Sequence, residues 1–191
     1  MSENTESLAR GDALTPVTFA NFIERLRHDC VGEGVEDHCT ADALFIVQAR
    51  LIISGIDKDY TDQWLVYCDD RQWFSTKEYW DDCDEGQQEE LNAKAQEEGE
   101  CEFLALDEHD QWELLGELDD HTVTGWHERW EYVNAHFTKD AAEAFIRRKA
   151  HDYRDGLRVY VDSQYYCWEF KAIKEALLSG ALTLNNMEKS A

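Results

Sequence analysis

Apolar side chains recur at helical spacing near the start of the chain and again in its last third. A first helix is predicted over residues 16–28, with Thr15 as its N-cap and Pro16 at its first helical position. Two more helices are predicted later, one capped by Thr138 and ended by Gly156, and a last one closed by a glycine. The apolar positions that mark the three helices are Phe19, Phe22, Ile23, Leu26, Ala142, Phe145, Ile146, Phe170, Ile173 and Leu177.

Alternating apolar and polar positions predict the strands. These stretches are 44–53, 64–68, 101–106, 112–118, 130–137 and 157–161. The first two are close enough in sequence to pair as a hairpin, whereas the aromatic-rich run 71–80 predicts neither helix nor strand. Residues 85–98 favour a helix by composition, but Leu91 is their only large apolar side chain, so this helix is expected to face solvent, to bridge, or to be marginal.

The order of these elements predicts an α+β fold. A mostly antiparallel or mixed sheet is expected, packed by three to four helices and carrying an acidic helical and hairpin segment. We expect a single domain over residues 14–180 that contains the acidic segment at 57–120. Residues 1–13 and 181–191 are expected to be flexible ends of the chain.

Charge is distributed unevenly along this pattern. The 191 residues have a net charge of −24, and residues 57–120 hold 23 acidic against four basic residues, a net of −19. Residues 1–56 have a net charge of −5, and residues 121–191 hold ten acidic and ten basic residues. A field of this strength repels nucleic acid and attracts basic molecules. Direct nucleic-acid binding is therefore excluded, and a basic nucleic-acid-binding protein or complex becomes the expected partner.

The remaining composition predicts a folded cytoplasmic protein. Hydrophobic residues make up 43% and aromatic residues 12% of the chain, which is too apolar for a disordered acidic tail. No stretch approaches the roughly 20 apolar residues of a membrane span, and the first residues lack the apolar segment of a signal peptide. Six scattered cysteines without a C-x-x-C pair are typical of reduced thiols.

The acidic segment is the candidate binding surface. Between Glu78 and Glu102 there are eleven acidic residues and one lysine, and aromatic residues lie nearby. Such a surface can imitate a nucleic-acid backbone in a basic channel, with tryptophan and tyrosine as anchors. The predicted partner-binding carboxylates are Glu78, Asp81, Asp82, Asp84, Glu85, Glu89, Glu90, Glu97, Glu98, Glu100 and Glu102, and the predicted anchors are Trp73, Tyr79, Trp80 and Trp112.

Charge density limits this hypothesis. Duplex DNA carries about one charge per 1.7 Å, so 19 net charges match roughly 32 Å of duplex. The predicted helix 85–98 has five acidic residues and one lysine over about 21 Å, or one net charge per roughly 5 Å. Mimicry therefore requires several elements side by side, and a solvated face that only keeps the protein in solution is the simpler alternative.

A metal site finds less support. His28, Cys30, His38 and Cys39 are the residue types that bind structural zinc. However, the neighbours His38 and Cys39 are poorly placed to bind one ion together, and a helix-end histidine with buried cysteines explains the pattern as well. No metal or cofactor is predicted.

A catalytic site finds no support from motifs. The chain has no phosphate-binding loop, H-E-x-x-H or G-x-S-x-G motif. The nearest candidates follow the last strand or lie in the same third of the chain, and they are Asp162, Ser163, Cys167, His136 and His151. Their spacing defines no mechanism, so no catalytic residue is predicted. An enzyme or small-ligand-binding protein with a merely solvated acidic insertion is one alternative, and a virion assembly protein is a second.

Several short stretches outside the acidic segment share a pattern with known sequences. They are His38–Ala41, Ile53–Tyr60, Trp130–Val133 with Phe137–Thr138, and Arg158–Ser163 followed by Tyr165 and Glu169. Together they resemble a family of uncharacterised proteins encoded by phages and prophages. The resemblance covers most of residues 38–178, is sparse between Tyr60 and Trp126, and supplies no catalytic residues. It implies a small acidic inhibitor of host defence, of the anti-CRISPR or anti-restriction type, in the cytoplasm of an infected bacterium.

Overall fold

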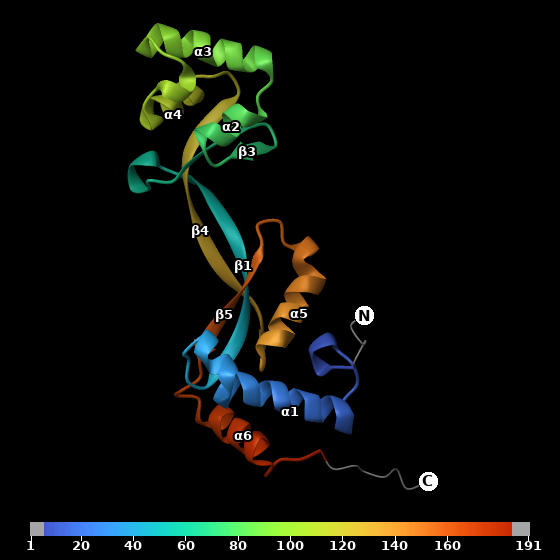
Figure 1. Cartoon of the computed structure of the whole chain (residues 1–191). Coiled ribbons are helices and arrows are strands. Elements are labelled where there is room, and N and C mark those ends of the chain that lie inside the picture. Colours follow the sequence, from blue (N-terminus) through green and yellow to red (C-terminus); the bar gives the residue numbers. More distant parts are fainter. Residues whose placement is uncertain (1–5, 185–191) are drawn as a thin grey trace. The chain divides into compact units, whose positions relative to one another are not determined.

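A computed structural model describes residues 6–184, apart from the side chain of Glu98. This part of the chain forms six α-helices and five β-strands, which confirms the α+β class (Figure 1). The helices are α1 (Pro16–Val31), α2 (Thr76–Asp82), α3 (Glu85–Gly99), α4 (Glu108–Gly116), α5 (Lys139–Lys149) and α6 (Trp168–Ser179). The strands are β1 (Ala43–Ile56), β2 (Trp64–Cys68), β3 (Arg71–Trp73), β4 (His121–His136) and β5 (Leu157–Ser163). Short 3-10 helices lie at Leu8–Arg10, Glu33–Asp37, Lys58–Tyr60, Phe103–Ala105 and Ala150–Asp152.

The five strands form one sheet in the order β3-β2-β4-β1-β5. Strand β5 pairs antiparallel with β1, and β2 pairs antiparallel with β3 and with β4. The expected hairpin between the strands at 44–53 and 64–68 is therefore wrong. Both strands exist, but β4 lies between β1 and β2 in the sheet.

The chain divides into two compact units. The first unit comprises residues 1–51 and 130–191, and the second comprises residues 52–129. The acidic segment predicted at 57–120 lies entirely within the second unit. Of the ends expected to be flexible, residues 1–5 and 185–191 lie outside the described residues, and Leu8–Arg10 forms a short 3-10 helix.

In the first unit, helix α5 packs against the sheet. The residues of this core are Ala43, Phe45, Val47, Val133, Ala142, Phe145, Ile146, Leu157, Val159 and Val161. Helices α1 and α6 lie beside each other (Figure 1). The predicted cap of α1 is confirmed, because the Thr15 side chain accepts a hydrogen bond from the backbone N–H of Thr18. The last helix ends at Gly180 as predicted, with φ 77° at that glycine.

The helix after β4 differs from its prediction at both ends. Thr138 occupies the N-cap position but makes no capping hydrogen bond with its side chain. Buried Asp29 on α1 replaces it, since its Oδ2 accepts a hydrogen bond of 2.8 Å from the backbone N–H of Lys139. Helix α5 ends at Lys149 rather than at Gly156, and the glycine, with φ 100°, instead turns the chain into β5.

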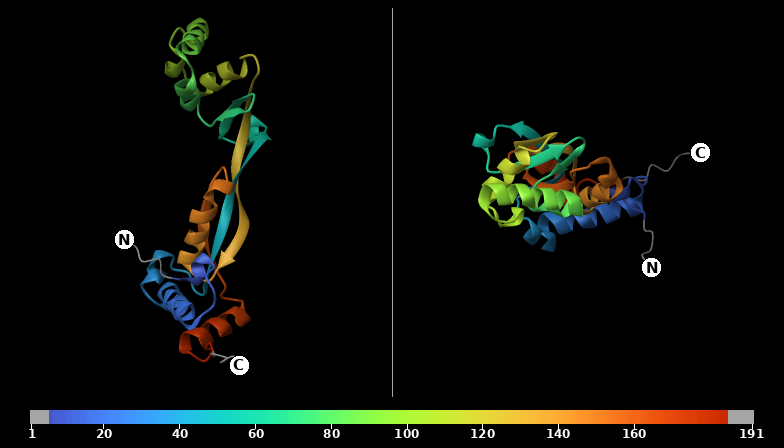
Figure 2. Two further views of the ribbon diagram at one scale, coloured as in Figure 1. Left: turned by 90° about the vertical axis from the view of Figure 1, so that its right-hand side faces the viewer. Right: turned by 90° about the horizontal axis from the view of Figure 1, so that it is seen from above.

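In the second unit, helices α2, α3 and α4 gather around a separate core (Figure 2). The buried residues of this core are Val66, Tyr79, Leu91, Ala95, Phe103, Trp112, Leu114 and Leu115. The partly buried hydrophobic residues around it are Trp64, Trp73, Trp80, Cys83, Leu106, Leu118 and Val123.

The strands predicted at 101–106 and 112–118 are wrong. Residues 103–105 form a 3-10 helix, and α4 occupies 108–116. Asp107 begins α4, because its side chain accepts a hydrogen bond from the backbone N–H of His109. The buried positions of α4 are Gln111, Trp112, Leu114 and Leu115, which is helical rather than alternating spacing. In a run this short, the two patterns are easily confused.

Candidate interaction surface

The described acidic side chains of the second unit all face solvent. Residues 52–129 contain 24 acidic and five basic residues, a net charge of −19, against −5 for the rest of the chain. Every acidic residue of this unit whose side chain is described is exposed. Ten of the eleven predicted partner-binding carboxylates are therefore exposed, and the side chain of Glu98 lies outside the described part of the chain.

Helix α2 fixes three of these carboxylates by local contacts. Glu78, in the first turn, accepts a hydrogen bond of 2.8 Å from the backbone N–H of Phe74. Asp81 pairs with Lys77 at 2.8 Å. Asp82 accepts hydrogen bonds from Arg71 Nη1 at 2.9 Å and from Trp73 Nε1 at 3.2 Å. These three groups are ordered, and two of them are already partly neutralised.

Helix α3 presents a polar face to solvent and a narrow stripe to the core. Asp84 begins it with a capping box, in which its side chain accepts from Gln87 N and Gln87 Oε1 accepts from Asp84 N. The inward stripe has helical spacing and consists of Gln88, Leu91, Asn92 and Ala95. Leu91 is 2% exposed and Ala95 is fully buried.

The two amides on this stripe attach α3 to its neighbours. Gln88 Nε2 donates to the carbonyl oxygen of Trp80, and Asn92 Oδ1 accepts from the backbone N–H of Phe103, each at 3.0 Å. Hydrogen bonds thus replace apolar contacts that the helix lacks. The opposite face carries Glu85, Glu89, Glu90 and Glu97, all exposed, with Glu90 paired to Lys94 at 3.7 Å.

Two of the four predicted aromatic anchors are wrong. Tyr79 is 5% and Trp112 4% exposed, so neither side chain can contact a partner on the folded unit. They belong to the core, where Tyr79 contacts Trp73 and Trp112 contacts Trp64 edge to face. A cluster of tryptophans beside acidic residues is explained here by a small unit that needs large side chains to fill its core.

The other two anchors are half-buried. The ring of Trp80 stacks on Phe103 with centroids 5.7 Å apart, and the indole N–H of Trp73 donates to Asp82. These rings support the acidic surface from beneath. Any contact they make with a partner is limited to the exposed part of each ring.

The acidic surface extends beyond the predicted residues. Seven more carboxylates on α4 and in the turn before β4 are exposed, namely Asp107, Glu108, Asp110, Glu113, Glu117, Asp119 and Asp120. Their acidity was visible in the sequence. They lie within the acidic segment predicted at 57–120, although they were not among the residues named as partner-binding.

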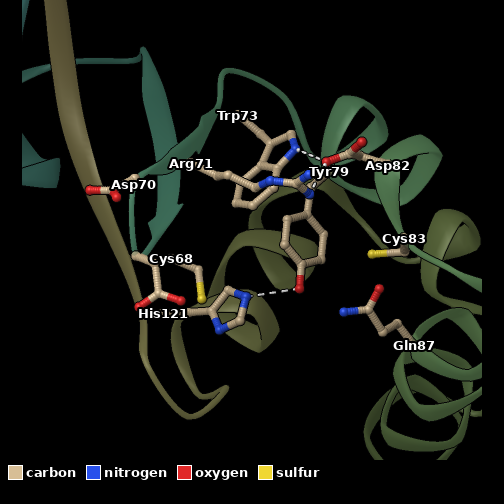
Figure 3. Close-up of a pocket in the computed structure, with 10 residues that line it drawn as sticks. Cys68, Asp70, Arg71, Trp73, Tyr79, Asp82, Cys83, Gln87 and His121 are labelled. Atoms are coloured by element: carbon tan, nitrogen blue, oxygen red, sulfur yellow. Dashed lines mark hydrogen bonds and ion pairs between the residues drawn. The ribbon is translucent and has the colours of Figure 1, made fainter.

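A cavity of about 300 Å³ opens beside α2 (Figure 3). In it, Tyr79 Oη lies 2.8 Å from His121 Nε2, and His121 Nδ1 lies 2.7 Å from the carbonyl oxygen of Asp119. Burial raises the pKa of the Tyr79 hydroxyl, and it raises the pKa of the thiols of Cys68 and Cys83 as well. Both thiols are therefore protonated at neutral pH, which makes them poor nucleophiles.

The predicted zinc-type residues do not converge on one point. His38 Nε2 lies 3.0 Å from the carbonyl oxygen of Asp29, and its Nδ1 accepts from Thr40 N at 3.0 Å. His28 contacts the Asp29 carboxylate at 3.0 Å, and burial raises the pKa of Cys30. The fold thus uses these side chains to join the end of α1 to the following loop.

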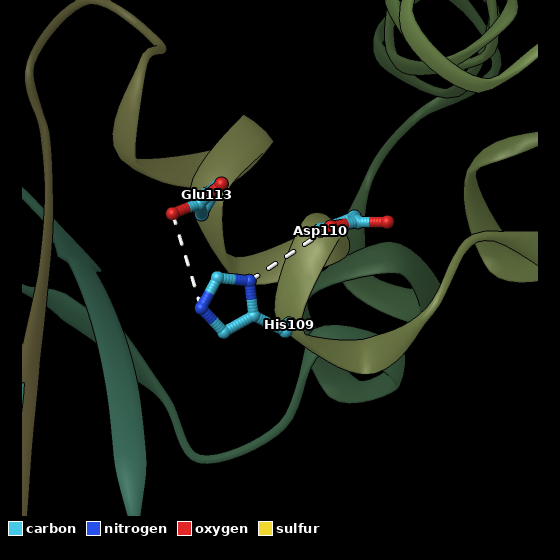
Figure 4. A group of neighbouring side chains, drawn as sticks. All are labelled: His109, Asp110 and Glu113. Carbon is cyan, nitrogen blue, oxygen red and sulfur yellow. Dashed lines mark ion pairs between the residues drawn. The ribbon is translucent and has the colours of Figure 1, made fainter.

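A different group has its donor atoms close together. His109, Asp110 and Glu113 on α4 have one ligand atom each within 4.8 Å of the others, and all three side chains are exposed (Figure 4). His109 also contacts the ring of Trp64 at a centroid distance of 5.6 Å. Exposed groups of this kind on one helix are common, and the group adds to the acidic surface.

The strand-end residues considered for catalysis each contact a different partner. Ser163 Oγ donates to the carbonyl oxygen of Ala41, and Asp162 accepts from Gln164. His136 lies 3.0 Å from Asn134 Oδ1, and burial lowers its pKa. His151 pairs with Asp152 at 3.0 Å, and Cys167 is exposed. The geometry joins none of these groups into a nucleophile and base pair.

Comparisons with models of protein families, with curated protein sequences and with solved structures found no match. No catalytic family or homologue therefore supports an enzymatic activity. Among the helices of residues 6–184, none has the length and apolar character needed to cross a lipid bilayer.

Proposed function

We propose that this protein inhibits a nucleic-acid-binding complex of host defence by occupying its basic channel with the acidic surface of residues 52–129. It would act as the anti-CRISPR and anti-restriction inhibitors of phages do, in the cytoplasm of the infected cell. The observation that supports this proposal is that every described acidic side chain is exposed in a unit of net charge −19.

The distribution of charge favours a binding role over simple solvation. Acidic residues that only keep a protein in solution can lie anywhere on its surface. Here the second unit, with 78 of the 191 residues, holds 24 of the 42 acidic residues. The mutual repulsion of these groups destabilises the unit that carries them. A basic partner would offset that repulsion, whereas water and salt would only screen it.

The fold also addresses the low charge density of a single helix. Contacts join α2 to α4 and α3 to the 3-10 helix at Phe103–Ala105, so elements distant in sequence surround one core. Their carboxylates therefore belong to one folded body rather than to one helix. DNA presents about one charge per 1.7 Å along its axis, and a surface built from several elements can approach that density.

The contact is expected to be mainly electrostatic. With Tyr79 and Trp112 inside the core, the predicted aromatic anchors cannot supply most of the binding free energy. Exposed charge pairs contribute modestly one by one, and salt weakens them. We expect fast, steered association and an affinity that falls steeply as salt increases.

The test is capture from a bacterial host lysate with the tagged full-length chain. The variant replaces four exposed glutamates of the acidic surface by glutamine, Glu89, Glu97, Glu100 and Glu102. The matched control replaces four exposed glutamates of the first unit, Glu24, Glu33, Glu36 and Glu175. Both variants change the net charge by the same amount, so any difference between them reports on position.

Wild type and the matched control are expected to capture the same nucleic-acid-binding complex at low salt and to lose it at high salt. The amount of complex captured by the acidic-surface variant at low salt should be lower than that captured by wild type by a factor of about ten or more. Equal capture by all three chains, or capture that salt leaves unchanged, would refute the proposal.

A further inference from the structure

Strand β5 of the first unit is an open edge. It ends the strand order of the sheet, and within residues 6–184 the only strand that pairs with it is β1. Its seven residues contain neither proline nor lysine, two common devices that keep an edge from pairing with another chain. An edge of this length without such protection is suited to a further strand.

The backbone of β5 shows which groups face that edge. Gly156 O accepts a hydrogen bond from Arg50 N, and Gln164 N donates to Asp42 O, both at 3.0 Å. Even-numbered residues therefore point their backbone groups at β1, because in an antiparallel pair alternate residues bond to the same neighbour. The odd-numbered residues, Leu157, Val159, Val161 and Ser163, point their N–H and C=O groups at the open edge.

The side chains of β5 also alternate between the two faces of the sheet. Leu157, Val159 and Val161 lie in the core beneath α5. On the opposite face, Arg158 and Tyr160 are exposed, with Tyr160 at 47%, and Asp162 is half-buried. Arg158 extends over β1 and β4 on this face, since its Nε donates to Gln48 Oε1 at 2.9 Å and its guanidinium lies 4.0 Å from the ring centre of Trp130. An ion pair across the open edge would replace these contacts.

This edge is complementary to itself. When two copies of β5 run antiparallel with Tyr160 opposite Tyr160 of the second copy, Arg158 of each copy lies opposite Asp162 of the other. Val159 then lies opposite Val161, and the odd-numbered residues of both strands exchange backbone hydrogen bonds. Arg158 and Asp162 fall at the positions without backbone hydrogen bonds, where opposed side chains are closest.

The register follows from the same residues. The two strands can shift along each other only in steps of two residues. A shift of one residue would set odd-numbered residues opposite even-numbered ones, whose backbone groups point toward β1. A shift of two in one direction sets Arg158 opposite Tyr160, and in the other direction it sets Tyr160 opposite Asp162. Either shift loses both ion pairs, so a single register is favoured.

We propose that two copies of this chain associate through an antiparallel β5–β5 contact centred on Tyr160. The contact joins the sheets of two first units, and a twofold axis relates them. It is independent of the acidic surface, since it uses residues of the first unit alone. Because each chain has a net charge of −24, repulsion opposes association at low salt, and the contact is expected to form where that repulsion is screened.

The test uses two single charge reversals, Arg158→Asp and Asp162→Arg, with the full chain at about 0.15 M salt, where the Debye length is about 8 Å. Sedimentation equilibrium measures the molar mass of wild type, of each variant and of an equal mixture of the two variants. Each variant alone sets like charges opposite each other. In the mixture, both opposed pairs become one Asp and one Arg, so complementarity returns.

The proposal predicts a wild-type dimer, two monomeric variants and a dimer in their mixture. Circular dichroism confirms that each variant is folded. A wild-type chain that stays monomeric up to near-millimolar concentration would overturn the proposal. Slow amide exchange at Val159 and Val161 in that monomer would show that another part of the chain covers the edge. Dimers of both single variants would overturn it as well, because the contact would then lie elsewhere.

Discussion

At the scale of single residues, buried polar groups join distant parts of the first unit. Lys174 on α6 forms an ion pair with Asp42, and both side chains are less than 10% exposed. Asp29 caps α5 from α1 in a similar way. Neither pairing could be predicted, because the partners lie 132 and 110 residues apart and the sequence alone does not bring them together.

Removing one partner of the buried ion pair should destabilise the first unit. We expect Lys174→Met to lower the free energy of unfolding by about 3–5 kcal/mol, since Asp42 would stay buried with an uncompensated charge. Urea denaturation followed by far-ultraviolet circular dichroism measures this change. Asp42 has φ 52°, so the companion change Asp42→Asn keeps a residue that tolerates a left-handed backbone.

The double variant K174M/D42N should recover part of the lost stability, because no buried charge remains. A single variant as stable as wild type would show that the pair contributes nothing. A double variant no more stable than K174M would show that lost packing, rather than the unpaired charge, causes the effect.

At the scale of elements, the strongly periodic segments were predictable and the acidic ones were less so. Helices α1 and α6 and strands β1 and β5 follow the apolar spacing of the sequence. The strand prediction at 112–118 falls on helix α4, since seven residues with four apolar side chains fit either period. Helix α3 was predicted, but its attachment through Gln88 and Asn92 was not, because amide hydrogen bonds to neighbouring backbone leave no pattern in the sequence.

The attachment of α3 depends on one large apolar side chain. Leu91→Ala should lower the free energy of unfolding of the second unit by about 2–5 kcal/mol, the usual range for a buried leucine. Hydrogen exchange at the amides of Leu114 and Leu115, in the same core, measures this loss.

Exposed Gln96 on the same helix supplies the matched control. Gln96→Ala should change exchange at these amides by no more than about 0.5 kcal/mol. If Leu91→Ala were equally harmless, α3 would not depend on this core, and the acidic face it carries would have no fixed position on the unit.

At the scale of the whole molecule, the two units differ in net charge, which is −19 for the second unit and −5 for the first. The uneven charge and its location were read from the sequence, and the exposure of the carboxylates agrees with that reading. The anchoring role predicted for Tyr79 and Trp112 was wrong, because tryptophan and tyrosine beside charge occur both at interfaces and in small cores. Only the arrangement of α2, α3 and α4 distinguishes the two cases.

Salt should stabilise the second unit more than the first. At about 0.1 M salt the Debye length is about 10 Å and at about 1 M it is about 3 Å, so added salt reduces repulsion among exposed carboxylates. The second unit has a net charge of −19 and the first −5, so their responses should differ. Amide exchange is expected to slow with salt more at Leu91 and Leu115 than at Phe45 and Val47. Equal slowing in both cores would contradict this account of the repulsion.

The most direct test of the central claim is competition with DNA. The complex captured from the lysate is purified and loaded with a fluorescent duplex, and fluorescence anisotropy follows release of the duplex as the protein is added. The account predicts that wild type and the first-unit control release the duplex. The variant E89Q/E97Q/E100Q/E102Q should release it only at a concentration about tenfold higher, or more. A complex that holds the protein and the duplex together would contradict it.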